Sequence, residues 1–126
     1  MGTDIYAYIE VQDGNVWKLC GNDVCLNRNY TLFGLMAGVR SDVVMFEPRG
    51  LPSDTSSDLT KACSPTGYLE YGEAVPGHSG SWLTLEELIA VSEHETMKGY
   101  DTLTEVLDMM QDMGKGRPTR LVFWFD

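Results

Sequence analysis

Residues 4–20 read D-I-Y-A-Y-I-E-V-Q-D-G-N-V-W-K-L-C, a run in which apolar and polar side chains alternate. One face of its first half is apolar and is made by Ile5, Ala7, Ile9 and Val11. This period of two is typical of a half-buried β-strand. The pair Asp13-Gly14 follows at once, and such a pair is a strong hairpin signal, because a type I′ turn needs positive φ at both central positions. The sequence therefore predicts a hairpin whose second strand covers residues 15–20.

Residues 119–125 read T-R-L-V-F-W-F and predict a strand that is apolar on both faces. Such a strand lies centrally in a sheet, covered on each side, or at a subunit interface. Burying one large aromatic side chain contributes about 1.5–3 kcal/mol, so an exposed Trp124 would forfeit much of a small domain's stability. We therefore expect a twofold homodimer in which these strands or their outer faces pack together.

Helical patterns occupy three other stretches. The first covers residues 30–37 and ends before Gly38, which stands in the position of a left-handed C-terminal cap. It contains Gly34, and a glycine inside a helix indicates a close approach to its backbone. Capping boxes of the form T-x-x-E at residues 84–87 and 102–105 begin two further helices, over residues 85–93 and 103–113.

Residues 47–81 hold four of the five prolines and show no sustained period. We expect a long central loop there, and loops of that length in compact domains are functional or partly mobile. A brief strand or extended segment is expected at residues 43–46. Together the elements predict a single small α+β domain over residues 1–126, with an antiparallel or mixed sheet made by the hairpin and the terminal strand and backed by about three helices.

The overall charge of the chain excludes some classes of protein. Its 126 residues include 19 acidic and nine basic side chains, a formal net charge of −10. That balance argues against a protein that coats duplex DNA by counterion release. Apolar runs fall short of the roughly 18–20 residues needed to span a membrane, and residues 1–10 lack the basic region of a signal peptide. We expect a cytoplasmic protein without membrane contact.

Acidic residues concentrate between residues 70 and 112, where ten carboxylates accompany Lys98 as the single base. One interpretation is that they form the solvated faces of two helices. The alternative is a surface that contacts a basic protein in the place of nucleic acid. Its candidate residues are Glu86, Glu87, Glu93, Glu105, Asp108 and Asp112.

Arg28, Arg40 and Arg49 flank the first helix and the opening of the long loop. Guanidinium groups bind carboxylate or phosphate in bidentate fashion, so these residues indicate a site for a small anionic ligand. Salt bridges within the acid-rich chain explain them equally well. The stretch G-H-S-G-S-W-L-T at residues 77–84 would form the other side of that site, with polar and stacking groups before a capped helix. Its candidate residues are His78, Ser79, Ser81 and Trp82.

Catalytic signatures are weak. The serine-hydrolase pattern G-x-S-x-G matches only in part, because Ser81 stands where it needs glycine. Metal-dependent hydrolysis by His78, His94 and carboxylates lacks an H-E-x-x-H signature. An odd number of cysteines favours reduced thiols, and a zinc site would need histidines as well. Those cysteines are Cys20, Cys25 and Cys63. We expect no cofactor, no metal and no catalytic residue.

Four blocks of the chain resemble a family of small, uncharacterised proteins of bacteria and their phages. They are D-I-Y-A-Y-I-E at residues 4–10, R-N-Y-T-L-F-G-L-M-A-G-V-R at 28–40, R-G-L-P-S-D at 49–54 and H-S-G-S-W-L-T-L-E-E-L at 78–88. Gly80 stands where the family pattern H-S-H-S has histidine, which weakens a metal-binding or two-histidine catalytic role. The resemblance implies a phage or mobile-element setting, in which small acidic proteins bind host components, and it implies no particular activity. If a phage encodes the protein, the expected location is the host cell's cytoplasm.

The sequence thus predicts a binding protein rather than an enzyme. The main expectation is a pocket for a small anionic, nucleotide-like ligand, such as a host signalling nucleotide that the protein sequesters. One alternative is an acidic protein-protein inhibitor of a host nucleic-acid-binding or defence protein. The other is a metal-dependent hydrolase.

Overall fold

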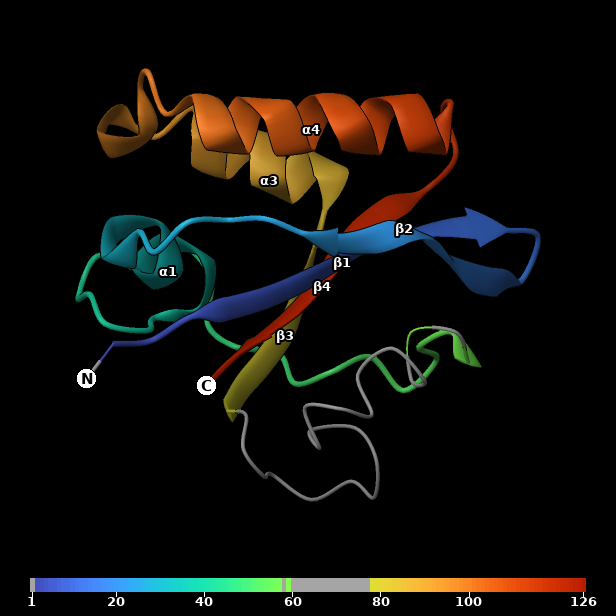
Figure 1. Ribbon diagram of the computed structural model, residues 1–126, viewed down its shortest axis with the longest axis horizontal. Coiled ribbons are helices and arrows are strands. Elements are labelled where there is room, and N and C mark those ends of the chain that lie inside the picture. The colour runs from blue at the N-terminus through green and yellow to red at the C-terminus, as the bar shows by residue number, and fades with distance from the viewer. Residues whose placement is uncertain (1, 58, 60–77) are drawn as a thin grey trace.

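A four-stranded antiparallel sheet organises the residues that the computed structural model describes, which are 2–57, 59 and 78–126 (Figure 1). Its strands are β1 (Ile5–Asp13), β2 (Val16–Val24), β3 (His78–Thr84) and β4 (Thr119–Phe125), in the order β2-β1-β4-β3. All three neighbouring pairs are antiparallel. The predicted α+β fold is confirmed, and its sheet is antiparallel rather than mixed.

The N-terminal hairpin is confirmed, with a turn one residue later than expected. Asp13 pairs with Val16, so the two turn residues are Gly14 and Asn15. Gly14 has a φ of 64° and Asn15 is not among the residues with positive φ. Positive φ at the first central position alone is the pattern of a type II′ turn, so the expected type I′ turn is wrong. β2 also continues to Val24, beyond the predicted end at residue 20.

The first predicted helix, α1 (Tyr30–Ala37), is confirmed together with its C-terminal cap at Gly38. The Asn29 side chain accepts a hydrogen bond from the Leu32 N–H, and Gly38 ends the helix at a φ of 67°. The expected close approach at Gly34 is also present. A Cβ atom built at Gly34 would lie 2.4 Å from the Cβ atom of Ser41, so glycine is required where the chain folds back over the helix.

α3 (Leu85–Ser92) begins with the predicted capping box, in which Thr84 and Glu87 exchange side-chain and backbone hydrogen bonds. After the short 3-10 helix η2 (Glu95–Met97), α4 (Asp101–Gly114) begins two residues before the position expected from a box at residues 102–105. That box is wrong. The preceding turn, with Gly99 at a φ of 78°, brings the chain into helical conformation at Asp101, and Tyr100 caps the helix without a side-chain hydrogen bond.

The terminal strand β4 lies between β1 and β3, and all seven of its residues are buried, as its two apolar faces predicted. Leu121, Phe123 and Phe125 belong to the core cluster that includes the helices, which lie together on one side of the sheet (Figure 1). Val122 and Trp124 belong to a second cluster on the other side. The sheet therefore has an apolar layer on each face.

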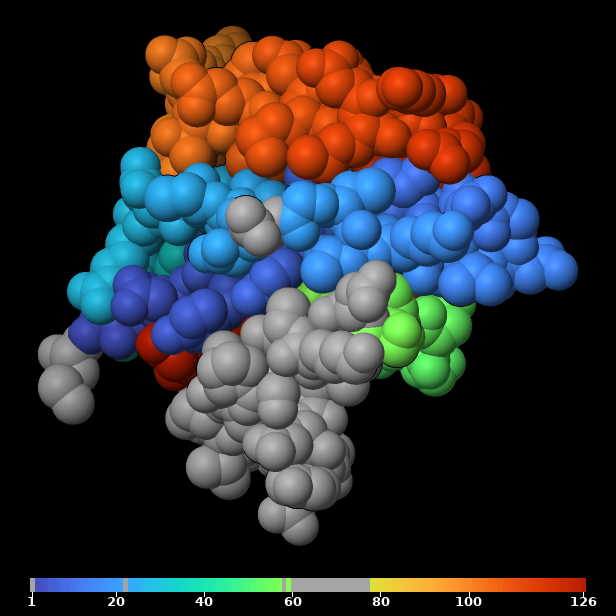
Figure 2. Space-filling view, turned by 45° about the vertical axis from the view of Figure 1, so that its right-hand side comes forward, coloured from blue at the N-terminus to red at the C-terminus, as the bar shows by residue number. Residues whose placement is uncertain are grey.

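The face opposite the helices is covered from within the same chain. Trp124 is fully buried, stacks on Tyr8 with ring centroids 5.6 Å apart, and shares its cluster with Leu59. The segment that carries Leu51 and Leu59 runs beneath the sheet, as Figures 1 and 2 show. The homodimer stays a prediction. That prediction was based on the need to cover the second apolar face of β4, and a single chain already supplies this cover.

The predicted loop at residues 47–81 is wrong at its end, where residues 78–81 belong to β3. β3 is rich in serine and glycine, and it is an edge strand held by its pairing with β4. Residues 43–46 form no strand, because the Met45 and Phe46 N–H groups both donate to the Leu35 carbonyl of α1. Residues 60–77 lie outside the described residues. None of the described helices is long and apolar enough to cross a membrane.

Candidate functional site on the sheet face opposite the helices

A buried ion pair lies on the sheet face opposite the helices. Arg120 of β4 is in register with Glu10 of β1 and with Thr84 of β3. The Arg120 side chain is 5% exposed and that of Glu10 is 0% exposed. Nε and Nη2 of Arg120 lie 2.8 Å and 2.7 Å from the same carboxylate oxygen, Oε1 of Glu10. Each charge thus compensates the desolvation of the other, which a buried charge requires.

The same ion pair attaches the segment of residues 51–59 to the sheet. The Ser56 N–H donates to Oε2 of Glu10 at 2.8 Å, and the Ser56 hydroxyl accepts from the Leu59 N–H at 3.1 Å. Oδ1 of Asp54 lies 3.1 Å from Nη1 of Arg120. Unlike Glu10, the Asp54 side chain is 62% exposed. The buried Glu10 carboxylate therefore holds the segment, and the segment's own Asp54 contacts Arg120 from the surface.

Two tryptophans flank the guanidinium group of Arg120. Its Cζ atom lies 3.9 Å from the ring centroid of Trp17, on β2, and 5.9 Å from that of Trp82, on β3. Trp82 also has the Cζ atom of Arg49 at 4.6 Å from its centroid. Guanidinium groups at these distances are attracted to the face of an indole ring, so both tryptophans are fixed in place by cations.

A groove of about 520 Å³ opens over these residues. Its lining combines aromatic rings, hydroxyls, a carboxylate and a guanidinium: Trp17, Leu51, Pro52, Ser53, Asp54, Trp82, Thr84 and Arg120. A second groove of about 510 Å³ adjoins it along the hairpin and shares Trp17 and Asp54 with it. Volumes of this order and a mainly apolar wall with a few polar groups are typical of small-molecule sites.

Of the residues predicted for the ligand site, Arg49, Ser81 and Trp82 are brought together. The Arg49 N–H donates to the Ser81 hydroxyl at 2.9 Å, and Nη1 of Arg49 donates to the Trp82 carbonyl at 3.3 Å. Arg49 is also ion-paired with Glu87, to which Nη1 donates at 2.8 Å. This hydrogen bond holds the pKa of Glu87 below its ordinary value and raises that of Arg49. The arginine is thus a salt-bridge partner, the alternative that the sequence left open.

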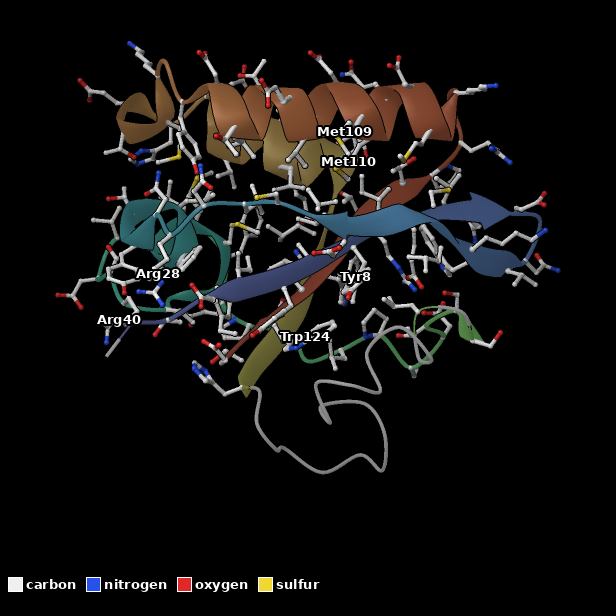
Figure 3. The ribbon with its side chains drawn as sticks, viewed as in Figure 1. Tyr8, Arg28, Arg40, Met109, Met110 and Trp124 are labelled. Carbon is white, nitrogen blue, oxygen red and sulfur yellow. The ribbon has the colours of Figure 1, made fainter. Side chains whose placement is uncertain are left out.

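Arg28 and Arg40 lie elsewhere, at the α1 end of the molecule (Figure 3). Nε of Arg28 donates to Oδ1 of Asp4 at 2.6 Å, and this bond lowers the pKa of Asp4. The Cζ atom of Arg40 lies 4.6 Å from the ring centroid of Tyr30. A hydrogen bond from the Thr3 N–H, followed by Arg40 and Arg28, lowers the pKa of Tyr30. Arg28 and Arg40 therefore gather at Tyr30 and Arg49 at Trp82, each with its own partners.

His78 and Ser79 lie at the opposite end of β3 from the groove. His78 pairs in register with Phe125 and Thr84 with Arg120, and these two partners are about 17 Å apart along β4. The imidazole of His78 makes hydrogen bonds with the Ser79 hydroxyl at 2.9 Å and with the Asp126 main-chain oxygen at 3.1 Å. The structure therefore separates both residues from Trp82, which the sequence had placed with them.

The acidic residues predicted for a partner surface lie on α3 and α4. Exposed members of this set are Glu86, Glu93, Glu105, Asp108 and Asp112. Glu87, by contrast, is half-buried, and its carboxylate accepts hydrogen bonds from Arg49 and from the Thr84 N–H. It is a structural residue of the helix start rather than part of an open acidic surface.

Metal-ligating side chains are scattered over the part of the chain that the structure describes. No group of three or more His, Cys, Asp or Glu residues that could hold a metal ion occurs among the described residues. Cys20 is half-buried, Cys25 is exposed, and both are free thiols. Cys63, the third candidate for a zinc site, lies outside the described residues.

Sequence reasoning missed the residues that form the buried part of the groove. Glu10 and Arg120 each stand on a strand whose other members are mainly apolar, at positions that alternate with the helix-facing ones. An acid in the interior of one such strand and a base in the interior of another are a detectable signal, because buried charges occur in pairs. Trp17 carried no comparable signal beyond its place in an alternating strand.

Comparison with known proteins finds no match to the chain among family models, curated proteins or solved structures.

Proposed function

We propose that this protein binds a small anionic, nucleotide-like ligand in the groove between Trp17 and Trp82. The observation that carries the proposal is the groove of about 520 Å³ in which two indole rings flank the buried guanidinium of Arg120. A planar base stacks on tryptophan in a sequence-tolerant way, with about 1–3 kcal/mol per stacked base. Arg120 offers a charged donor for an anionic group of the ligand.

The polar groups of the groove suit a ligand that has both donors and acceptors. Ser53 and Thr84 contribute hydroxyls, and Asp54 contributes an acceptor for exocyclic amines. The two carboxylates beside Arg120 are both ion-paired with it. We therefore propose binding rather than catalysis. In the phage or mobile-element setting that the sequence resemblance implies, binding would sequester a host signalling nucleotide.

The direct test is a thermal-shift screen against mono-, di- and cyclic nucleotides. A ligand at 100 times its dissociation constant adds about 2.7 kcal/mol to the free energy of unfolding, which raises the Tm of a domain of this size by about 10 °C. The Trp17→Leu and Trp82→Leu variants should lose this shift. The matched control is Arg40→Gln, which removes a remote cation and should retain it.

Two results would contradict the proposal. One is an unchanged Tm of the folded wild-type protein with every nucleotide tested. The other is a shift that survives both tryptophan replacements and disappears in Arg40→Gln, because that result would place the ligand at the α1 end with Arg28 and Arg40.

The acidic helix α4 supports a second candidate function, inhibition of a basic host protein. Asp101, Glu105, Asp108 and Asp112 recur at spacings of three and four residues, so they share one face of the helix, and all four are exposed. A partner attracted by this face should be retained from lysate at low salt and lost at high salt. Neutralising Glu105, Asp108 and Asp112 should abolish retention.

The matched control for this second candidate neutralises an equal number of exposed acids outside α4, at Asp13, Asp23 and Asp42. It changes net charge by the same amount. Equal loss of the partner in both triple variants would show that net charge, rather than the α4 face, is responsible.

A further inference from the structure

We infer that Asp54 is a displaceable internal anion, which occupies the outer edge of the Arg120 guanidinium until an anionic group of the ligand replaces it. The inference rests on the proposed function of the groove and names the residue that sets its affinity for anions. It follows from the unequal way in which the two carboxylates beside Arg120 are held.

Glu10 is fixed and Asp54 is not. The Glu10 side chain is fully buried and accepts from Nε of Arg120 and from the Ser56 N–H, with Nη2 of Arg120 also 2.7 Å away. Asp54 approaches Nη1 of Arg120 at 3.1 Å from a side chain that is 62% exposed. Surface ion pairs of this kind add little to stability, whereas removing one partner of a buried pair is strongly destabilising. A competing anion therefore replaces Asp54 and not Glu10.

Nη1 of Arg120 is the part of the guanidinium that a ligand can use. Nε donates to Glu10, Nη2 is buried 2.7 Å from the same carboxylate oxygen, and Nη1 lies 3.1 Å from Asp54, which lines the groove together with Arg120. The guanidinium remains 95% buried and stacked on Trp17, so its position is set before any ligand arrives. A phosphate or carboxylate placed at the Asp54 oxygen would inherit an oriented, charged donor.

Departure of Asp54 does not detach the segment that carries it. Two residues further on, the Ser56 N–H stays bonded to Glu10, and Leu59 is fully buried in the cluster around Trp124. Displacement thus needs a change of side-chain conformation at Asp54 and no loss of the contacts that Ser56 and Leu59 make.

While Asp54 remains, its negative charge repels the anion that must take its place. Removal of that charge should favour anion binding by about tenfold, the effect of one unit charge a few ångströms away in a largely aqueous environment. Asp54→Asn is nearly isosteric and removes the charge. Asp54→Glu retains the charge and should behave as the wild type.

The experiment titrates inorganic phosphate into the wild type, Asp54→Asn and Asp54→Glu, and follows the indole N–H resonance of Trp17, whose ring stacks on Arg120. The matched control is Asp13→Asn, which removes another exposed carboxylate from its ion pair with Lys18. We expect the dissociation constant of phosphate to fall about tenfold in Asp54→Asn alone. Equal phosphate affinity in Asp54→Asn and Asp13→Asn, or a gain that leaves the Trp17 resonance unmoved, would overturn the inference.

The two proposals fail separately. If no nucleotide binds but Asp54→Asn gains phosphate affinity at Trp17, the displaceable anion stands and recognition of a base is refuted. If nucleotides bind the wild type and Asp54→Asn gains no phosphate affinity, the inference about Asp54 is refuted and the proposed function stands.

Discussion

Replacement of Glu10 by leucine should destabilise the protein more than any change to its exposed ion pairs. Leucine has a similar volume but accepts no hydrogen bonds. The change leaves Arg120, which is 5% exposed, without its buried counterion and leaves the Ser56 N–H without its acceptor. Both groups then have to remain buried without compensation or be exposed by movement of the segment at residues 51–59.

The magnitude follows from these two losses. Removing one partner of a buried ion pair reduces the free energy of unfolding by about 3–5 kcal/mol. Asp54 still reaches Nη1 of Arg120, which places the expected loss near the lower end, at about 3 kcal/mol. With a urea m-value of about 1.5 kcal/mol/M, the midpoint of urea denaturation should fall by about 2 M.

A second variant separates the ion pair from the packing around it. The double replacement Glu10→Leu with Arg120→Met removes both charges and should be less destabilised than Glu10→Leu alone, because no charge is left buried. The control is Asp13→Asn, which breaks the exposed pair with Lys18 and should change stability by less than about 0.5 kcal/mol. Equal urea midpoints for Glu10→Leu and Asp13→Asn would refute this reasoning. A double variant that is less stable than Glu10→Leu would refute it as well.

Three further outcomes follow from the packing and the charges. Gly34→Ala should destabilise the protein by about 1–3 kcal/mol despite alanine's better helix propensity, because its Cβ would lie 2.4 Å from that of Ser41; adding Ser41→Gly should recover part of the lost Tm. The hydrogen bond from Arg49 lowers the pKa of Glu87, so this carboxylate stabilises the fold above the ordinary pKa of a glutamate and loses its effect as the pH falls through the lowered value. Glu87→Gln should therefore flatten the acid limb of the stability profile measured by urea denaturation. Trp124→Ala should lower stability by about 3–5 kcal/mol at every protein concentration, because Trp124 is fully buried within one chain, and a loss seen only where sedimentation shows a dissociating wild-type dimer would contradict that.

Much of the fold could be predicted because its signals are local. The capping box at Thr84 and Glu87 and the left-handed cap at Gly38 each act within a few residues, and the structure has both. The apolar pattern of residues 119–125 also predicted a strand that is either central in the sheet or at a subunit interface, and the structure has it in the centre. Helix starts were predicted less well where the preceding turn sets them. The turn at Gly99 begins the helix at Asp101, so Thr102 does not cap it.

The missing strand and the groove depend on contacts between distant residues. The stretch that forms β3 is rich in serine and glycine, and only its pairing with β4 makes it a strand. The arginines were expected to converge because they flank the first helix and the opening of the long loop. Arg28 instead pairs with Asp4, and Arg49 pairs with Glu87. The acidic residues of the chain thus bind these arginines at separate places, and the arginines do not form a common site.

The pair of Glu10 and Arg120 shows what the sequence did contain about the site. Both residues lie on the sheet face opposite the helices, in strands whose other buried residues are uncharged. Neither charge can be buried without the other. If the two charges must meet, β1 and β4 must be neighbours, and Glu10 must lie opposite Arg120, which is the register observed. One buried ion pair therefore implies the order of the two central strands, the face on which the polar groups gather, and the position of the groove beside Trp17 and Trp82. Because the same pair holds Ser56, the constraint that aligns the strands also places the wall of the proposed ligand site.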